Sequence, residues 1–447
     1  MIQAFSGSAS EFICFGGDMS RNFLWWVMFL MPLPIFISPS SPVLLASGTI
    51  GDDALAFPLS FFLLPIAIFF TLKNYKNIVG FNLFLYFWLS LFAIWVLLLS
   101  FYSASLQPVA LLYALQWCLL FLWGGYFLST IRLENVKYIV RPFFYGAFIG
   151  AAYIFLSGVL EYIIYGALLD AGRVSQNLIF KGQYQLVVYT PTVLAFSFLI
   201  VLSFYKANLF SLPRSALVVY FAICFVAIIF TGSREGLLVC LLGGCLVGII
   251  TSVRAALVVC FVGLFLLFIL YINFDYLLLV LDASEFRALN KIARLADDGA
   301  ALGARDVMLK IYLQFIIFDP VLGLKMLPPE LAYPVSDITI RSAHNLYVDV
   351  WAWTGFPGFL ALIFFLISLV AFAANSIVRG LLSKYPNNLE LSFSWVVLVM
   401  LLISNNINVP LRQPVVVPVF LLCVALLALS AKKQQPSKQG SSEITLS

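Results

Sequence analysis

Ionisable side chains are scarce in this chain of 447 residues, of which only 10% are charged and one, His344, is a histidine. Seven cysteines are scattered without a C-x-x-C pair, so with one histidine no zinc site of ordinary spacing can form. The net charge of +5 comes from loops and the tail, and it indicates membrane topology rather than nucleic-acid binding. Because histidine exchanges protons near neutral pH, His344 is the first candidate for chemistry.

Apolar residues make up 63% of the chain and its mean hydropathy is +1.05, which predicts an all-α, polytopic membrane protein. Hydropathy predicts twelve transmembrane helices. They are expected near residues 23–38, 54–72, 79–101, 108–130, 142–168, 184–204, 214–231, 235–250, 255–275, 355–375, 391–405 and 414–430.

Lysine and arginine gather in alternate connections between these spans, which predicts that both termini face the cytoplasm. The basic connections and the tail contain Arg21, Lys73, Lys76, Arg132, Lys137, Arg141, Lys206, Arg214, Arg254, Arg379, Lys384, Lys432, Lys433 and Lys438. The long loop 276–344 is then periplasmic if the protein lies in a bacterial inner membrane.

The chain divides into five predicted parts. These are a cytoplasmic leader (1–22), nine transmembrane helices (23–275), the large periplasmic loop (276–344), three further transmembrane helices (345–430) and a disordered cytoplasmic tail (431–447). Within the large loop we expect an amphipathic helix from Ala283, a break near Gly299 and Gly303, and a second helix through Arg305 to Phe318. Asp319-Pro320 should end that second helix.

Arg234 follows the seventh span in the short turn Thr231-Gly232-Ser233-Arg234-Glu235-Gly236, so little freedom is left to it. It is either an interfacial arginine that reaches water or a fixed guanidinium for a phosphate. Arg173, Arg305 and Arg341 fall on the same predicted side, where a lipid diphosphate would lie. For each of them ordinary contact with anionic lipid is the alternative, as a structural role is for His344.

Ser342-Ala343-His344-Asn345-Leu346-Tyr347 and the following Thr354-Gly355-Phe356-Pro357-Gly358 resemble the histidine–asparagine motif of the O-antigen ligase/polymerase family. Arg305 with Phe318-Asp319-Pro320-Val321-Leu322-Gly323 resembles the family's loop arginine and D-P-x-x-G stretch. Gly232-Ser233-Arg234 is similar to its S-R-G turn, although Glu235 precedes the glycine here.

The resemblance implies a GT-C-like integral membrane glycosyltransferase that needs no metal and no cofactor. Such an enzyme moves a glycan from undecaprenyl diphosphate to an acceptor hydroxyl on the periplasmic face, with inversion. His344 would be the catalytic base, and Arg234 and Arg305 would bind the diphosphate, with Arg173 and Arg341 as weaker candidates. Ser233, Asn345 and Asp349 would support them. Implied partners are the lipid-linked donor, a glycan or lipid A-core acceptor, membrane lipids and a chain-length regulator, with no nucleic acid.

One departure separates this chain from many members of the family, which carry glutamate nine residues after the histidine. Trp353 stands there, and Asp349 is the nearest acid. This divergence slightly favours an O-antigen or exopolysaccharide polymerase, which joins repeats, over a ligase, which moves finished polymer to lipid A-core. A lipid or polysaccharide transporter is the alternative from another class, but no internal repeat supports it.

Overall fold

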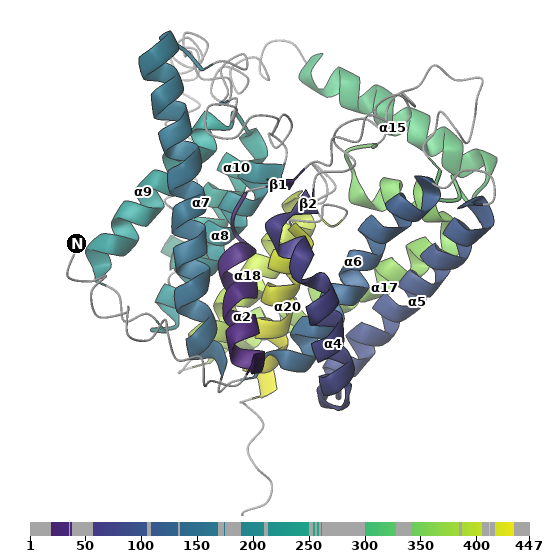
Figure 1. Ribbon diagram of the computed structural model, residues 1–447, viewed down its shortest axis with the longest axis horizontal. Helices are drawn as coiled ribbons and strands as arrows, with labels where there is room; N and C mark the ends of the chain where they lie inside the picture. Colours follow the sequence, from purple (N-terminus) through teal and green to yellow (C-terminus); the bar gives the residue numbers. More distant parts are fainter. Residues whose placement is uncertain are drawn as a thin grey trace, which may run out of the picture.

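The computed structural model is a bundle of helices with one very short strand pair (Figure 1). It describes residues 19–34, 36–37, 57–104, 109–132, 135–168, 174, 189–209, 213–249, 254, 257–258, 261, 300–327, 342–383, 387–404, 411 and 416–432. The strands β1 (Phe36–Ile37) and β2 (Phe57–Pro58) pair antiparallel and close the connection between the first two helices. The all-α prediction is therefore right apart from this ladder.

The helices of the first half of the chain begin with α2. They are α2 (Met19–Leu30), η2 (Leu59–Leu63), α4 (Leu64–Asn74), η3 (Tyr75–Asn77), α5 (Phe81–Ala104), α6 (Val109–Thr130), α7 (Val136–Tyr165), α8 (Tyr189–Lys206) and α9 (Arg214–Phe230). The second half contains α10 (Arg234–Leu238), η5 (Val239–Gly243), α11 (Gly244–Ile249), α15 (Ala300–Phe318), α17 (Leu346–Leu382), α18 (Asn388–Val399), η6 (Met400–Ser404) and α20 (Val416–Lys432). Two of these, η5 and η6, are single π-helical turns within longer helices.

Among the described residues, four helices are long and apolar enough to cross a membrane. They are Phe81–Ala104, Ala110–Thr130, Tyr138–Tyr165 and Leu346–Leu382. Shorter apolar helices coincide with the predicted spans 184–204, 214–231, 391–405 and 414–430, whereas nearly all of the ninth, 255–275, lies outside the described residues. The count of twelve and the GT-C-like fold therefore stay predictions.

Helix α5 shows how the bundle sorts its side chains. Leu85, Leu89, Phe92, Val96 and Leu99 recur at helical spacing and are buried against α6 and α17. The opposite face exposes large apolar side chains, which suits contact with lipid acyl chains. They include Leu83, Phe84, Phe87, Leu91, Ile94, Leu98 and Phe101. Helices α6 and α20 are far more buried and form the centre of the core.

The two ends of the bundle differ in charge, because the helices run up and down. At one end, here called the basic end, α2 and α7 begin and α4, α6 and α17 end. It contains Arg21, Lys73, Lys76, Arg132, Arg141, Lys206, Arg214 and Arg379. The opposite end, here called the site end, contains the turns before α10 and α17 and the helix α15 (Figure 1).

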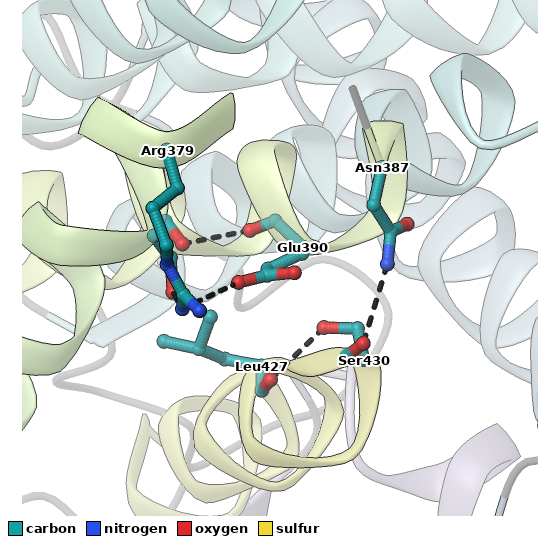
Figure 2. A network of polar contacts seen from close by, with 7 residues as sticks. Arg379, Asn387, Glu390, Leu427 and Ser430 are labelled. Atoms are coloured by element: carbon teal, nitrogen blue, oxygen red, sulfur yellow. Dashed lines mark hydrogen bonds and ion pairs between the residues drawn. The ribbon is translucent and has the colours of Figure 1, made fainter. Parts of the chain in front are cut away.

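A polar network ties three helices together at the basic end (Figure 2). Arg379 Nη2 of α17 donates to Glu390 Oε1 of α18 at 3.2 Å, and Glu390 is only 3% exposed. Asn387, at the start of α18, donates to the Ser430 carbonyl of α20 at 3.2 Å. The first bond holds the last turns of α17 against α18, and the second holds the start of α18 against α20.

Two predictions about helix ends are wrong. The tenth span was expected to start at residue 355, but α17 starts at Leu346 and extends over 37 residues with a kink at Gly355. Gly303 was expected to break the loop helix, but α15 runs through it from Ala300 to Phe318 and ends at Asp319 as predicted. The expected helix from Ala283 lies outside the described residues.

Candidate functional site

His344 lies in a tight turn that is held by its own neighbours. Asp349 Oδ1 accepts from the Ala343 amide at 2.6 Å and Asp349 Oδ2 from the Ser342 hydroxyl at 2.7 Å. The Ser342 hydroxyl oxygen in turn accepts from the His344 amide at 2.9 Å. These bonds hold His344 at φ 53°, a left-handed conformation that is uncommon for a side chain with a Cβ.

Asn345 closes the turn by capping α17. Its side-chain oxygen accepts from the Tyr347 amide at 3.0 Å and the Val348 amide at 3.2 Å, which satisfies two of the unpaired donors of the first helical turn. Asp349 also lies in that first turn, where the helix dipole favours a negative charge. Its side chain is completely buried, so the bonds from Ser342 and Ala343 offset the cost of burying a carboxylate. These hydrogen bonds thus hold the turn that carries the half-buried His344.

Trp353 stands nine residues after His344, where the resemblance led us to expect glutamate. It is fully buried and its ring centroid lies 4.9 Å from that of Tyr113 on α6. The position therefore serves packing between α17 and α6.

Arg234 occupies a second turn at the site end. Gly232 has φ 67° and turns the chain after α9, and Ser233 caps α10 by accepting from the Gly236 amide at 3.1 Å. Arg234 is the first residue of α10 and is half-buried, so its backbone is fixed by the helix start. The Val174 amide donates to the Phe230 carbonyl at 2.8 Å, which ties the segment after α7 to the end of α9.

The two turns lie at the same end of the bundle and are linked through the π-helical turns. The Tyr347 hydroxyl, in the first turn of α17, donates to the Leu401 carbonyl of η6 at 3.2 Å. Turn η6 packs against η5, which continues directly from α10. Single π-helical turns occur often beside functional sites. A contiguous path thus connects the His344 turn to the Arg234 turn.

A main-chain joint fastens the end of the large loop to α17. The kink at Gly355 (φ 66°, ψ −176°) leaves the preceding carbonyls without helical partners. The Leu324 amide donates to the Ala352 carbonyl at 2.7 Å and the Met326 amide to the Trp353 carbonyl at 3.2 Å. In return the Phe356 amide donates to the Pro320 carbonyl at 2.9 Å.

Two glycines make this joint possible. A Cβ on Gly355 would collide with the Val321 carbonyl, and one on Gly323 would collide with the Ala352 carbonyl. Asp319 shapes the loop by accepting from the Leu322 amide at 2.9 Å. The D-P-x-x-G stretch and Gly355 therefore connect α15 to the helix that begins beside His344.

The structure brings part of the predicted site together. Ser342, His344, Asn345 and Asp349 share one turn, and Ser233 and Arg234 share another. Arg305 lies on α15, but its side chain is outside the described part of the chain. Arg173 and Arg341 also lie outside it, so their roles and the metal-free character of the site stay predictions.

Several contacts that hold this region were not predicted from the sequence. The Trp95 indole donates to the Thr354 carbonyl at 2.7 Å, and the Ser103 hydroxyl to the Lys325 carbonyl at 2.6 Å. Both join α5 to the joint, but a tryptophan or serine in an apolar helix signals no partner in the sequence. Gly323 and Gly355 can be read from the sequence, but their backbone geometry cannot.

The fold and the two turns define a helical membrane protein with a polar, histidine-bearing site at the end opposite its basic loops. Residues 219–363 match the family model described as O-antigen ligase (Wzy_C). This segment, which is less than half of the chain, is similar to that family, and the similarity supports a role in glycan assembly. It contains both turns and the joint. No curated protein matches the chain.

Proposed function

We propose that the chain is a membrane glycosyltransferase that moves a glycan from undecaprenyl diphosphate to an acceptor hydroxyl during surface polysaccharide assembly. The site end would face the periplasm of a bacterial inner membrane. The observation that carries the proposal is the lone imidazole of His344, set in a left-handed turn by a buried carboxylate within the matching segment.

A sugar hydroxyl is a weak nucleophile, and a positioned base contributes about 10²- to 10⁴-fold to such a step. In the proposed step His344 takes the proton of the acceptor hydroxyl while its oxygen attacks the anomeric carbon. The bond from that carbon to the diphosphate oxygen breaks, and its electron pair stays on the diphosphate. One displacement of this kind inverts the anomeric carbon and needs no cofactor.

The growing charge on the diphosphate must be neutralised as it leaves. Arg234 and Arg305 are proposed for this role, because guanidinium groups stay charged and bind phosphate oxygens in pairs. Arg173 and Arg341 are weaker candidates.

We slightly favour a polymerase, because Trp353 replaces the glutamate found in many members of the family. The second candidate is a ligase, which the description of the matching family model favours. Deleting the gene for this protein would distinguish a polymerase from a ligase. Single repeats should accumulate on undecaprenyl diphosphate if a polymerase is lost, and full-length polymer should accumulate if a ligase is lost.

The sharpest test of the base is His344→Asn. Asparagine tolerates the left-handed conformation that His344 adopts at φ 53°, so the turn is kept while the imidazole is removed. We expect at least a hundredfold loss of glycan transfer, about the contribution of a general base. Gel analysis of surface polysaccharide and of carrier-linked glycan would measure it.

Gly166→Asn is a matched control. Gly166 ends α7 at φ 72°, and a Cβ added there would meet no atom within 4 Å, so asparagine should fit and transfer should persist. Normal polysaccharide in the His344→Asn strain would refute the proposed base and reopen the transporter alternative.

A further inference from the structure

A cavity of about 260 Å³ opens at the basic end, far along the bundle from the two turns. Four helices contribute to it where α2 and α7 begin and α4 and α6 end. Its described lining residues are Ser20, Arg21, Leu24, Phe70, Lys73, Asn74, Ser129, Thr130, Arg132 and Asn135. We call it the basic-end cavity.

Three cations converge on this cavity, and none of its described lining residues is a carboxylate. The Arg21 guanidinium lies 5.2 Å from the Tyr138 ring centroid of α7, a cation–π contact that leaves its charge uncancelled. Lys73 makes no hydrogen bond or ion pair within the described part of the chain. The described lining residues therefore carry positive charge only, which suits an anion.

The helix ends around the cavity contribute dipoles of opposite sign. Helices α2 and α7 both begin here, and a helix start carries a partial positive charge with unpaired amides. Arg21 stands in the first turn of α2, where its charge opposes the helix dipole. The ends of α4 and α6 offset part of this, since their carbonyls also face this end. Asn135 donates to the Thr130 carbonyl at 3.5 Å, and this bond occupies one of those acceptors.

Membrane topology alone does not explain the convergence. Membrane orientation depends on the number of cations in a loop. Lys76 and Arg141, at the same end, count toward that number as much as the three cavity cations do. Neither of them lines the cavity. Among the described residues, Arg21, Lys73 and Arg132 are the cations that line this one cavity, and they come from three separate segments.

The walls below the cations are apolar. Leu24 and Phe70 are 2% and 1% exposed and form the inner side of the cavity. Next to it on α4, Phe69 and Leu72 expose 53% and 69% of their surface on the face suited to lipid. A ligand with a phosphate at the rim and acyl chains beside α4 would match both features.

We propose that the basic-end cavity binds a phosphate group, presented by a membrane lipid or as free phosphate. Arg21, Lys73 and Arg132 supply charge, and Asn74, Ser129 and Asn135 supply polar contacts at the rim. This site is separate from the proposed transfer chemistry, so either can fail without the other.

The test uses the purified full-length protein in detergent, with bound lipid counted by native mass spectrometry. Phosphatidic acid is compared with diacylglycerol of the same acyl chains, because the two differ only in the phosphate. Inorganic phosphate is added as a competitor to distinguish a lipid-borne phosphate from free phosphate. The variants are Arg21→Gln, Lys73→Gln and Arg132→Gln, and Lys76→Gln is the matched control.

We expect phosphatidic acid to bind and diacylglycerol not to bind. Each cavity variant should weaken binding about three- to tenfold, since these cations are exposed and partly screened, and Lys76→Gln should leave it unchanged. Competition by millimolar inorganic phosphate would indicate free phosphate as the ligand and equally support the site. Equal binding of both lipids with no binding of phosphate, or an equal loss in Lys76→Gln, would overturn the proposal.

Discussion

At the scale of single residues, the backbone of His344 is the most informative feature. A residue with a Cβ at φ 53° is strained, and such strain persists only where neighbours over-determine it. Asp349, Ser342 and Asn345 hold the turn through five hydrogen bonds. Asp349 is therefore a positioning residue in the proposed mechanism.

Asp349→Asn tests this role. Ser342 and Ala343 donate to different oxygens of Asp349, and an amide replaces one of these acceptors by an NH2 donor, so one of the two bonds is lost. A bond to a charged group contributes about 1.5–3 kcal/mol. We expect glycan transfer to fall at least tenfold while the protein stays in the membrane. Polysaccharide gels and thermal unfolding in detergent would measure the two effects.

Glu390→Gln is the matched comparison, since it makes the same change to a buried carboxylate at the basic end. It should lower stability by a similar amount and leave transfer per folded molecule unaltered. If both variants lose transfer in proportion to their stability, Asp349 is only structural.

At the scale of elements, the kinked helix α17 organises the site end. Its first turn contains residues that hold His344, and the backbone at its kink is hydrogen-bonded to residues 320–326 of the loop. Its last turn is held by the ion pair between Arg379 and Glu390. Hydropathy placed its start nine residues late, because the polar first turn does not look like a membrane span. A sequence also gives no measure of the φ of Gly355, so the kink was invisible.

Gly355→Ala should break the joint. The position has φ 66° and ψ −176°, a region open essentially only to glycine, and a methyl group would meet the Val321 carbonyl. We expect the free energy of unfolding to fall by about 3 kcal/mol, from backbone strain and overpacking together. Thermal or denaturant unfolding in detergent would report it.

Gly248→Ala is the control, because a Cβ there meets Leu202 at an ordinary 3.6 Å in a regular helix. Its stability should change by less than about 1 kcal/mol. A Gly355→Ala variant as stable as this control would show that the kink is dispensable.

At the scale of the whole molecule, the loop cations and the candidate site residues lie at opposite ends of the bundle. The cations of the alternate connections lie at the basic end, and the His344 and Arg234 turns lie at the site end. The loop charges predict that the basic end faces the cytoplasm.

Cysteine labelling would test that orientation. In a chain with its own cysteines replaced, Val321→Cys and Lys76→Cys place one thiol at each end, and both positions are exposed. A reagent that cannot cross the inner membrane should label the first in intact cells and the second only after lysis. The reverse pattern would place the proposed chemistry in the cytoplasm.

The sequence was a good guide where signals are periodic or local. Apolar runs located most helices, Asp319-Pro320 ended α15, and the polar turns at Arg234 and His344 were identified as separate motifs. It failed where contacts join distant segments, as between Tyr347 and Leu401 or between Trp95 and Thr354. Arg21, Lys73 and Arg132 were likewise counted only as topology signals, because their convergence depends on the packing of four helices.

The joint between the large loop and α17 uses peptide groups almost exclusively, and this makes it insensitive to most amino-acid changes. Exchanging Val321 or Leu322 alters no donor or acceptor amide in it, whereas Lys325 adopts φ 54° and its ammonium lies 3.4 Å from the Asp319 carboxylate. Proline at residue 324 or 326 would remove a donated N–H and undo it. The amino-acid sequence of this loop can therefore vary at such positions while its backbone shape is kept.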